Sequence, residues 1–358
     1  MKTSVLALAA VAGLATMAQA QISMSLIRTI DTSSTAVNTN TNFVGSNVSA
    51  IAWNGSKLWV GGYNQAGSTA NTAIAAFDTS TSTWGTSFGT FATANLRGMT
   101  QMAVRGNQLA TALDNGAGNV NSVRSFNAST GALQWSTGGA APDASRRGNG
   151  VAFDPGFNGA GSNQGVAYLS IGSGRRHLLD ASTGGYINGQ NAGAILNTTG
   201  TTWRSLAFDP ATGDIYARES NRVTKSVRTG DNSVATQTFL GSLTTASTVD
   251  GQNIAFVNSA AFGNFLILND RSAASSGQAF TSVIRAMTTS GASLTINLNG
   301  FTAANGNGQY NFSWDAASQT LAVSDFANRQ VYIFAIPTPG SLALLGLGGL
   351  VAARRRRA

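Results

Sequence analysis

The chain of 358 residues has no cysteine, one histidine and one glutamate. Without cysteine it can form neither disulfides nor thiolate metal sites, so its stability must come from packing. Charged residues make up only 10% of the chain, whereas glycine alone accounts for 42 residues. A composition that is poor in lysine and glutamate and rich in turn formers favours an all-β domain over a helical one.

The first twenty residues have the order of a secretory signal peptide. A positive charge at Lys2 precedes an apolar stretch over residues 5–14, and the small-residue site Ala18-Gln19-Ala20 follows. We expect cleavage after Ala20, so that the mature chain begins at Gln21.

Residues 337–358 are predicted to form a separate tail. Pro337, Thr338, Pro339 and Gly340 precede an apolar or small stretch over residues 341–353, and four arginines follow at once. This stretch is shorter than the ~20 residues of an ordinary spanning helix. The arginine block would hold its end in the cytoplasm and leave the body of the protein outside.

This order of proline motif, apolar stretch and arginine cluster resembles the PEP-CTERM sorting domain, with Thr338 where that family has glutamate. The resemblance implies an exosortase-type processing enzyme as a partner and transient anchoring in the inner membrane. It further implies a final place on the envelope surface or in the extracellular matrix of a bacterium that produces exopolysaccharide. A plain tail anchor without sorting is the alternative.

The formal net charge of +8 comes mostly from the two ends. Without Lys2 and the four terminal arginines, 17 basic residues face 14 acidic residues, a net charge of +3. The charge is therefore no sign of a nucleic-acid partner.

A three-residue signature, consisting of an apolar residue, a small residue and an aromatic residue or valine, recurs at intervals of 48 to 58 residues. Turns and further β-rich runs follow each copy, so each unit has room for about four short strands, which is typical of a propeller blade. Six copies predict a six-bladed β-propeller over residues 21–336; a ring of seven or eight blades and a β-sandwich pair are the alternatives. The copies are Ile51-Ala52-Trp53, Met102-Ala103-Val104, Val151-Ala152-Phe153, Leu206-Ala207-Phe208, Ile254-Ala255-Phe256 and Phe312-Ser313-Trp314.

The last unit has room for only three strands before Pro337. Residues 22–30 alternate apolar and polar residues ahead of the first full unit, as a half-buried strand does. We therefore expect the N-terminal strand to complete the last blade, which would remove two exposed sheet edges.

Residues for catalysis are scarce. His177 follows two arginines, whose charge makes a histidine a poor proton acceptor, and we expect it in a solvated loop. Six of the thirteen aspartates, Asp78, Asp154, Asp180, Asp209, Asp214 and Asp315, lie in repeated turns, where they cap the backbone. The candidates left for an acid–base pair are Glu219, Asp250, Asp270 and Asp325. No catalytic residue, metal site or cofactor is predicted.

The loops of a propeller divide between two faces. The turn face carries the turns from the first to the second strand and from the third to the fourth; the crossing face carries the other turns and the crossings between blades. On this assignment the crossing face has ten arginines against six carboxylates, and the turn face has three basic residues against seven acidic ones.

Arginine forks bind carboxylates and phosphates. The sequence therefore predicts a non-catalytic, exported propeller that binds an acidic polysaccharide or a protein partner on its crossing face. A glycan hydrolase or lyase on the same scaffold and a purely structural matrix spacer are the alternatives. The candidate ligand-binding residues are Arg97, Arg146, Arg147, Arg204, Arg218 and Arg222.

Overall fold

The computed structural model describes residues 21–33, 47–63, 72–91, 98–114, 121–138, 146–157, 165–171, 175–187, 194–195, 203–219, 222–231, 233–242, 253–272, 281–301 and 310–336. The predicted signal peptide and tail lie outside these residues. Over the described ranges the chain is all-β, and no helix long and apolar enough to cross a membrane is found there.

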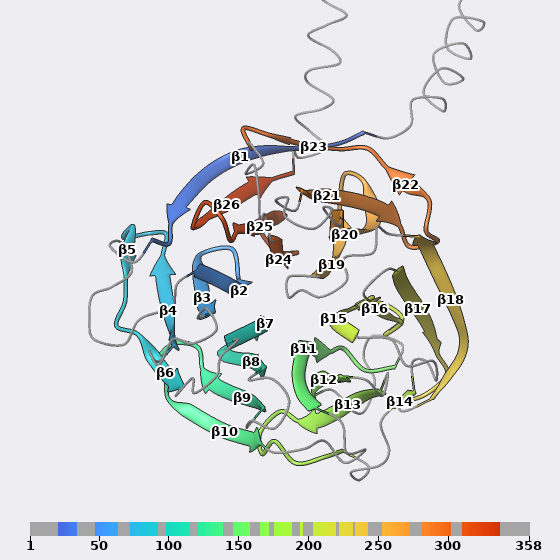
Figure 1. Ribbon diagram of the computed structural model, residues 1–358, viewed down its shortest axis with the longest axis horizontal. Helices are drawn as coiled ribbons and strands as arrows, with labels where there is room; N and C mark the ends of the chain where they lie inside the picture. Colours follow the sequence, from blue (N-terminus) through green and yellow to red (C-terminus); the bar gives the residue numbers. More distant parts are fainter. Residues whose placement is uncertain are drawn as a thin grey trace, which may run out of the picture.

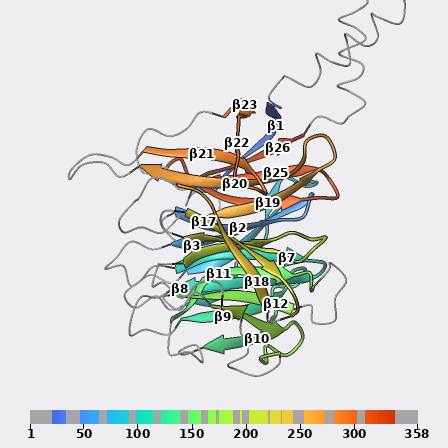
Figure 2. The same ribbon diagram turned by 90° about the vertical axis from the view of Figure 1, so that its right-hand side faces the viewer.

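The described strands form six blades around a ring, as predicted (Figure 1). The strands run across the thickness of the ring, as the view turned by 90° shows (Figure 2). A bridge between Tyr63 and Gly98 joins the first two blades into one nine-stranded sheet.

Within each blade the strands are given in order from the ring axis outward. Blade 1 has β2 (Asn47–Trp53), β3 (Lys57–Tyr63), β4 (Thr72–Asp78), β5 (Thr83–Trp84) and β6 (Phe88–Phe91), and blade 2 has β7 (Gly98–Arg105), β8 (Gln108–Asp114), β9 (Ser122–Asn127) and β10 (Leu133–Gly138). Blade 3 has β11 (Arg146–Asp154), β12 (Gly165–Ile171), β13 (Arg175–Asp180) and β14 (Ala194–Ile195), and blade 4 has β15 (Trp203–Phe208), β16 (Ile215–Glu219), β17 (Arg222–Arg228) and β18 (Val234–Ser242). Blade 5 has β19 (Ile254–Ser259), β20 (Gly263–Ser272), β21 (Thr281–Thr288) and β22 (Ser293–Leu294), and blade 6 has β24 (Tyr310–Asp315), β25 (Thr320–Asp325), β26 (Gln330–Ala335), β1 (Ile22–Asp31) and β23 (Ile296–Asn299).

Burial follows the position of each strand in its blade. The second strands β16 and β25 are buried at every residue because neighbouring blades cover both faces of the sheet. Strand β1, at the outside, alternates buried and more exposed residues over its first half. The core is therefore a set of apolar layers between blades.

Each copy of the signature lies on an innermost strand: β2, β7, β11, β15, β19 and β24. Its middle residue is alanine in five blades and Ser313 in the sixth. The innermost strands converge on the ring axis, and residues from all six line one central cavity. A small side chain at this position lets the backbones approach one another.

Strand β1 closes the ring, which confirms the prediction. It pairs antiparallel with β26, from Ser25 opposite Ala335 to Asp31 opposite Gln330. On its other side it pairs in parallel with β23, which extends the outer edge of blade 5 into blade 6. The N-terminal strand is thus held by ladders on both edges (Figure 1).

The outer turns of two blades lock onto the preceding blade through a glycine. Gly131 and Gly184 have φ values of +74° and +71°, a conformation that favours glycine. A Cβ on Gly131 would lie 2.5 Å from the ring of Phe88, and one on Gly184 would lie 2.6 Å from the ring of Trp135. The glycine therefore makes room for an aromatic side chain of the neighbouring blade.

The closure can be tested by a pair of substitutions in β1. Met24 is fully buried in the core of blades 5 and 6, whereas Ile27 is 58% exposed on the same strand. We expect Met24→Ala to lower the free energy of unfolding by about 2–5 kcal/mol. Ile27→Ala should change it by no more than about 0.5 kcal/mol. Urea denaturation measures both, and equal effects would contradict the closure by β1.

Candidate functional site

A concave site lies at the centre of the turn face. The innermost strands surround a cavity of about 220 Å³, and the rim includes Pro155 and Pro210 from the turns that follow β11 and β15. The last residues of the six signature copies form its walls: Trp53, Val104, Phe153, Phe208, Phe256 and Trp314. We call this cavity the mouth pocket.

Hydrogen bonds to neighbouring blades fix the two tryptophans of the mouth pocket. Trp53 Nε1 donates to Thr320 Oγ1 of blade 6 at 2.8 Å, and its backbone N donates to Ser313 Oγ at 2.9 Å. Trp314 Nε1 donates to Asn258 Oδ1 of blade 5 at 2.7 Å. The indole N–H groups are therefore satisfied by protein, and their rings are positioned before any ligand arrives.

Polar side chains connect the innermost strands deeper in the ring. Gln101 of blade 2 accepts a hydrogen bond from Val151 N of blade 3 at 3.1 Å and donates to Leu206 O of blade 4 at 3.3 Å. Asn311 of blade 6 donates to Ser49 O of blade 1 and, at 3.4 Å, to Thr100 O of blade 2. These bonds span several blades, so at this depth the strands are close together. Gln101 itself lines the mouth pocket.

The two carbonyls that Asn311 contacts belong to β-bulges. In β2 the register shifts between Val48 and Ala50, and in β7 it shifts between Met99 and Gln101. Ser49 and Thr100 are the residues at these register shifts. Asn311 therefore ties two bulged strands of blades 1 and 2 to blade 6.

Three of the six predicted ligand-binding arginines are not described at the side-chain level. Arg97 lies outside the described residues, as do most loops of the crossing face. Arg146 and Arg147 lie at the start of β11, but nothing is described of their side chains. The proposed role of these three arginines stays a prediction.

The other three arginines lie in blade 4. Arg204 is half-buried on β15. Arg218 is fully buried on β16, where it donates to backbone carbonyls that include Asn269 O at 3.3 Å, so its charge faces protein rather than solvent. Arg222 pairs with Glu219 at 2.7 Å and lies 3.9 Å from the ring centroid of Phe239.

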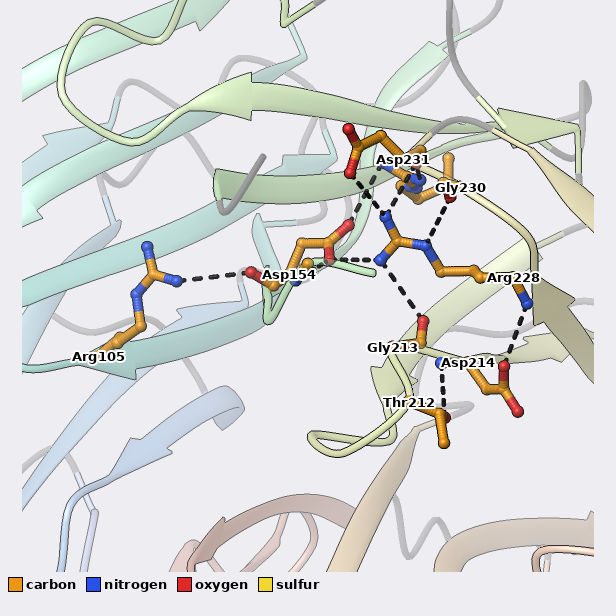
Figure 3. Close-up of polar contacts among 10 residues, drawn as sticks. Arg105, Asp154, Thr212, Gly213, Asp214, Arg228, Gly230 and Asp231 are labelled. Carbon is orange, nitrogen blue, oxygen red and sulfur yellow. Dashed lines mark hydrogen bonds and ion pairs between the residues drawn. The ribbon is translucent and has the colours of Figure 1, made fainter. Parts of the chain in front are cut away.

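A buried charge cluster joins blades 3 and 4 (Figure 3). Asp154, at the end of β11, is fully buried and pairs with Arg228 of blade 4 at 2.6 Å and with Arg176 of β13 at 3.3 Å. Arg105 of blade 2 donates to Asp154 O at 3.5 Å, and Asp231 lies 3.9 Å from Arg228. Burial lowers the pKa of the Arg176 guanidinium to about 10, while Asp154 favours its charged form.

Because of this cluster, both faces expose fewer charges to solvent than the count from the sequence suggests. Asp154 is one of the seven acidic residues counted on the turn face and Arg176 is one of the ten arginines counted on the crossing face, but both side chains are fully buried and paired with each other. The repeated aspartates at other turns behave as expected, since Asp78, Asp180 and Asp315 each cap a following serine. The face charges counted from the sequence therefore overstate what solvent meets.

The prediction for His177 was wrong. It lies on β13, only 1% exposed, and its ring stacks on Tyr168 with centroids 4.8 Å apart. Residues Arg176 to Leu179 of β13 are all buried, and Tyr168 belongs to the apolar layer between blades 2 and 3, so the His177 side chain lies in this layer instead of a loop. The two arginines before it gave no hint of this burial.

The candidate carboxylates do not form a visible pair. Asp250 and the side chain of Asp270 lie outside the described residues. Glu219 is fully buried and accepts bonds from Arg222 and Thr224. Asp325 caps its own turn at Ala327 and Asn328, and burial raises the pKa of its carboxyl.

Sequence reasoning found the residues of the mouth pocket but assigned them only to the fold. The last position of the signature was the signal that could have identified the pocket. It holds an apolar residue at the end of the innermost strand in every blade, and such residues need a place to pack. In the ring these positions meet at one opening.

No protein-family model and no curated protein matches this chain. Among solved structures it is similar to an auxiliary nutrient binding protein from Bacteroides thetaiotaomicron, with a TM-score of 0.52, 13% identity, and coverage of 81% of this chain and 69% of that chain. It is also similar to a β-propeller domain from Myceliophteria thermophila, with a TM-score of 0.45, 11% identity, and coverage of 82% and 84%. At such identities the likeness concerns the fold alone.

The charge cluster gives a stability prediction. Asp154→Asn should lower the free energy of unfolding by about 3–5 kcal/mol, because it removes the nearest counter-charge of two buried guanidinium groups. Asp180→Asn is the control, since Asn127 occupies the same turn position in blade 2 and caps it equally well. Urea denaturation compares the two, and equal losses would show that the cluster does not stabilise the ring.

Proposed function

We propose that this chain is an exported, non-catalytic binding protein that holds one unit of a neutral glycan in the mouth pocket. The observation that carries the proposal is the ring of aromatic side chains at one open end of the central cavity. Five blades supply these aromatic side chains and blade 2 supplies Val104, and the two tryptophans are fixed by bonds between blades.

The size of the mouth pocket sets the size of the ligand. Its volume of about 220 Å³ is below the roughly 300–1,000 Å³ of pockets that enclose whole drug-sized ligands. A single sugar ring at the end of a chain suits this volume, with the rest of the chain outside.

The walls of the mouth pocket favour a neutral ring with apolar faces. Aromatic faces carry negative potential and attract the slightly positive C–H groups of a sugar ring. The guanidinium of Arg105, which does not line the mouth pocket, lies 4.5 Å from the centroid of Phe153 and helps to fix this wall residue.

The lining also favours binding over hydrolysis. None of the described residues that line the mouth pocket is ionisable. Glycoside hydrolysis needs two carboxyl groups on either side of the scissile bond. Binding by packing and hydrogen bonding needs no such pair.

The strands of blade 6 lie between the two segments whose removal is predicted, as export with processing requires. Strand β1 starts at Ile22, two residues after the predicted cleavage site, and β26 ends at Ala335, two residues before Pro337. Removal of the signal and the tail would therefore leave every strand of blade 6 in place. The sorting route, the processing enzyme and display in the envelope or matrix belong to this proposal.

Binding can be tested with a tryptophan pair. Trp314→Ala should weaken binding to a neutral oligosaccharide at least about tenfold, equivalent to about 1.4 kcal/mol, because it removes one wall of the mouth pocket. Trp84→Ala is the control, since Trp84 packs on Phe77 away from the pocket. Isothermal titration over a panel of neutral glucans, mannans and xylans measures the affinities.

Trp314→Phe should retain most of the affinity, because phenylalanine holds the equivalent position in three other blades. Binding of a neutral ligand should also be insensitive to salt, whereas an acidic ligand on the arginines of the crossing face would bind more weakly as salt rises. Equal affinities of the two tryptophan-to-alanine variants would refute the mouth pocket as the site.

Processing has its own test. Protein recovered from the native envelope should begin at Gln21 and lack Arg354 to Arg357, as intact-mass spectrometry would show. A mass that includes the arginine cluster would leave only the plain tail anchor.

A further inference from the structure

A second cavity lies on the turn face between the outer parts of blades 1 and 2. Its volume is about 360 Å³, and we call it the outer groove. From blade 1 it is lined by Lys57, Asp78, Thr81, Thr83, Thr86 and Phe88, and from blade 2 by the turn at residues 128–131.

The outer groove lies where a phenylalanine, rather than a tryptophan, meets the outer turn of the next blade. Between blades 2 and 3, Trp135 packs on Gly184, and its Nε1 donates to Ala181 O at 2.7 Å. Between blades 1 and 2 the equivalent turn meets only Phe88, which packs edge-on against Phe126 at 5.6 Å. Space therefore remains beside Phe88.

The chemistry of the groove suits an uncharged ligand with many hydroxyl groups. Threonine hydroxyls both donate and accept hydrogen bonds, and Thr81, Thr83 and Thr86 are all exposed. One lysine and one aspartate add a strong donor and a strong acceptor without net charge. Phe88 offers an apolar ring for the C–H face of a sugar.

The aspartate keeps an acceptor for a ligand. Asp78 Oδ1 accepts both the backbone N and the Oγ of Ser80, at 2.9 and 2.6 Å. No bond to its Oδ2 is found among the described residues, and the side chain lies at the surface. Bonds from Ser80 hold the pKa of this carboxyl below its usual range, so it is ionised at neutral pH.

We infer that the outer groove is a second binding site for a neutral saccharide, separate from the mouth pocket. It shares its ligand class with the proposed function but uses none of the same residues. Blade 1 contributes to both sites on the turn face: Trp53 lines the mouth pocket and Lys57 lines the outer groove. Only the turn at residues 54–56 separates these two residues in the chain. A long glycan that reaches both sites would bind more tightly than a short one.

The test blocks the groove without touching the core. Thr81→Tyr places a large ring at its edge and removes the 2.7 Å contact between the Thr81 and Thr83 hydroxyls. Ser290→Tyr is the matched control, since it makes the same change at an exposed outer turn of blade 5 and removes the 2.9 Å contact between Thr288 and Ser290. Affinity electrophoresis is run in gels that contain a neutral glucan, a mannan or a xylan.

The parent should be retarded in at least one of these gels, and Thr81→Tyr should weaken the retardation at least threefold, with Ser290→Tyr unchanged. The double variant Thr81→Tyr/Trp314→Ala should be weaker than either single variant. Equal retardation of Thr81→Tyr and Ser290→Tyr would overturn the groove even if Trp314→Ala reduces binding. A loss in Thr81→Tyr without any loss in Trp314→Ala would leave the groove and overturn the mouth pocket. A parent that no gel retards would overturn both.

Discussion

The pairing of β1 with β26 and β23 is the constraint on which the rest of the ring depends. It joins residues from opposite ends of the chain, such as Ser25 and Ala335. Because β1 is paired on both sides, it has no open edge, and it also covers one edge of β26. Only in a closed ring can the six innermost strands line one central cavity. Such non-local pairing is slow to form, because a long loop must close before the contacts can stabilise it.

Crowding at the axis then determines what the centre can hold. Alanine or serine in the middle of each signature lets the strands converge, and Gln101 and Asn311 join strands of different blades deeper in the ring. The large residues at the strand ends cannot meet there, so they surround an opening on the turn face. The mouth pocket is thus a consequence of closure, and its preorganised rings limit the entropy lost when a ligand binds.

Much of this fold could be predicted from the sequence. The spacing of the signature gave the number of blades, and the alternation in residues 22–30 identified the closing strand. The site was harder to predict, because the spacing of residues along the chain does not show which side chains a neighbouring blade will cover. Asp154 looked like another turn aspartate and His177 like a loop residue, but both are buried by neighbouring blades. The outer groove depends on the difference between Phe88 and Trp135, which matters only once both turns are in place.

The central claim is that the turn face, through its aromatic pocket, binds a neutral sugar. A crystal structure of the mature chain soaked with the neutral oligosaccharide that binds best in solution tests this most directly. We expect density for a sugar ring between Trp53 and Trp314, with the glycan chain leading out over the turn face. Density confined to the arginines of the crossing face would contradict it.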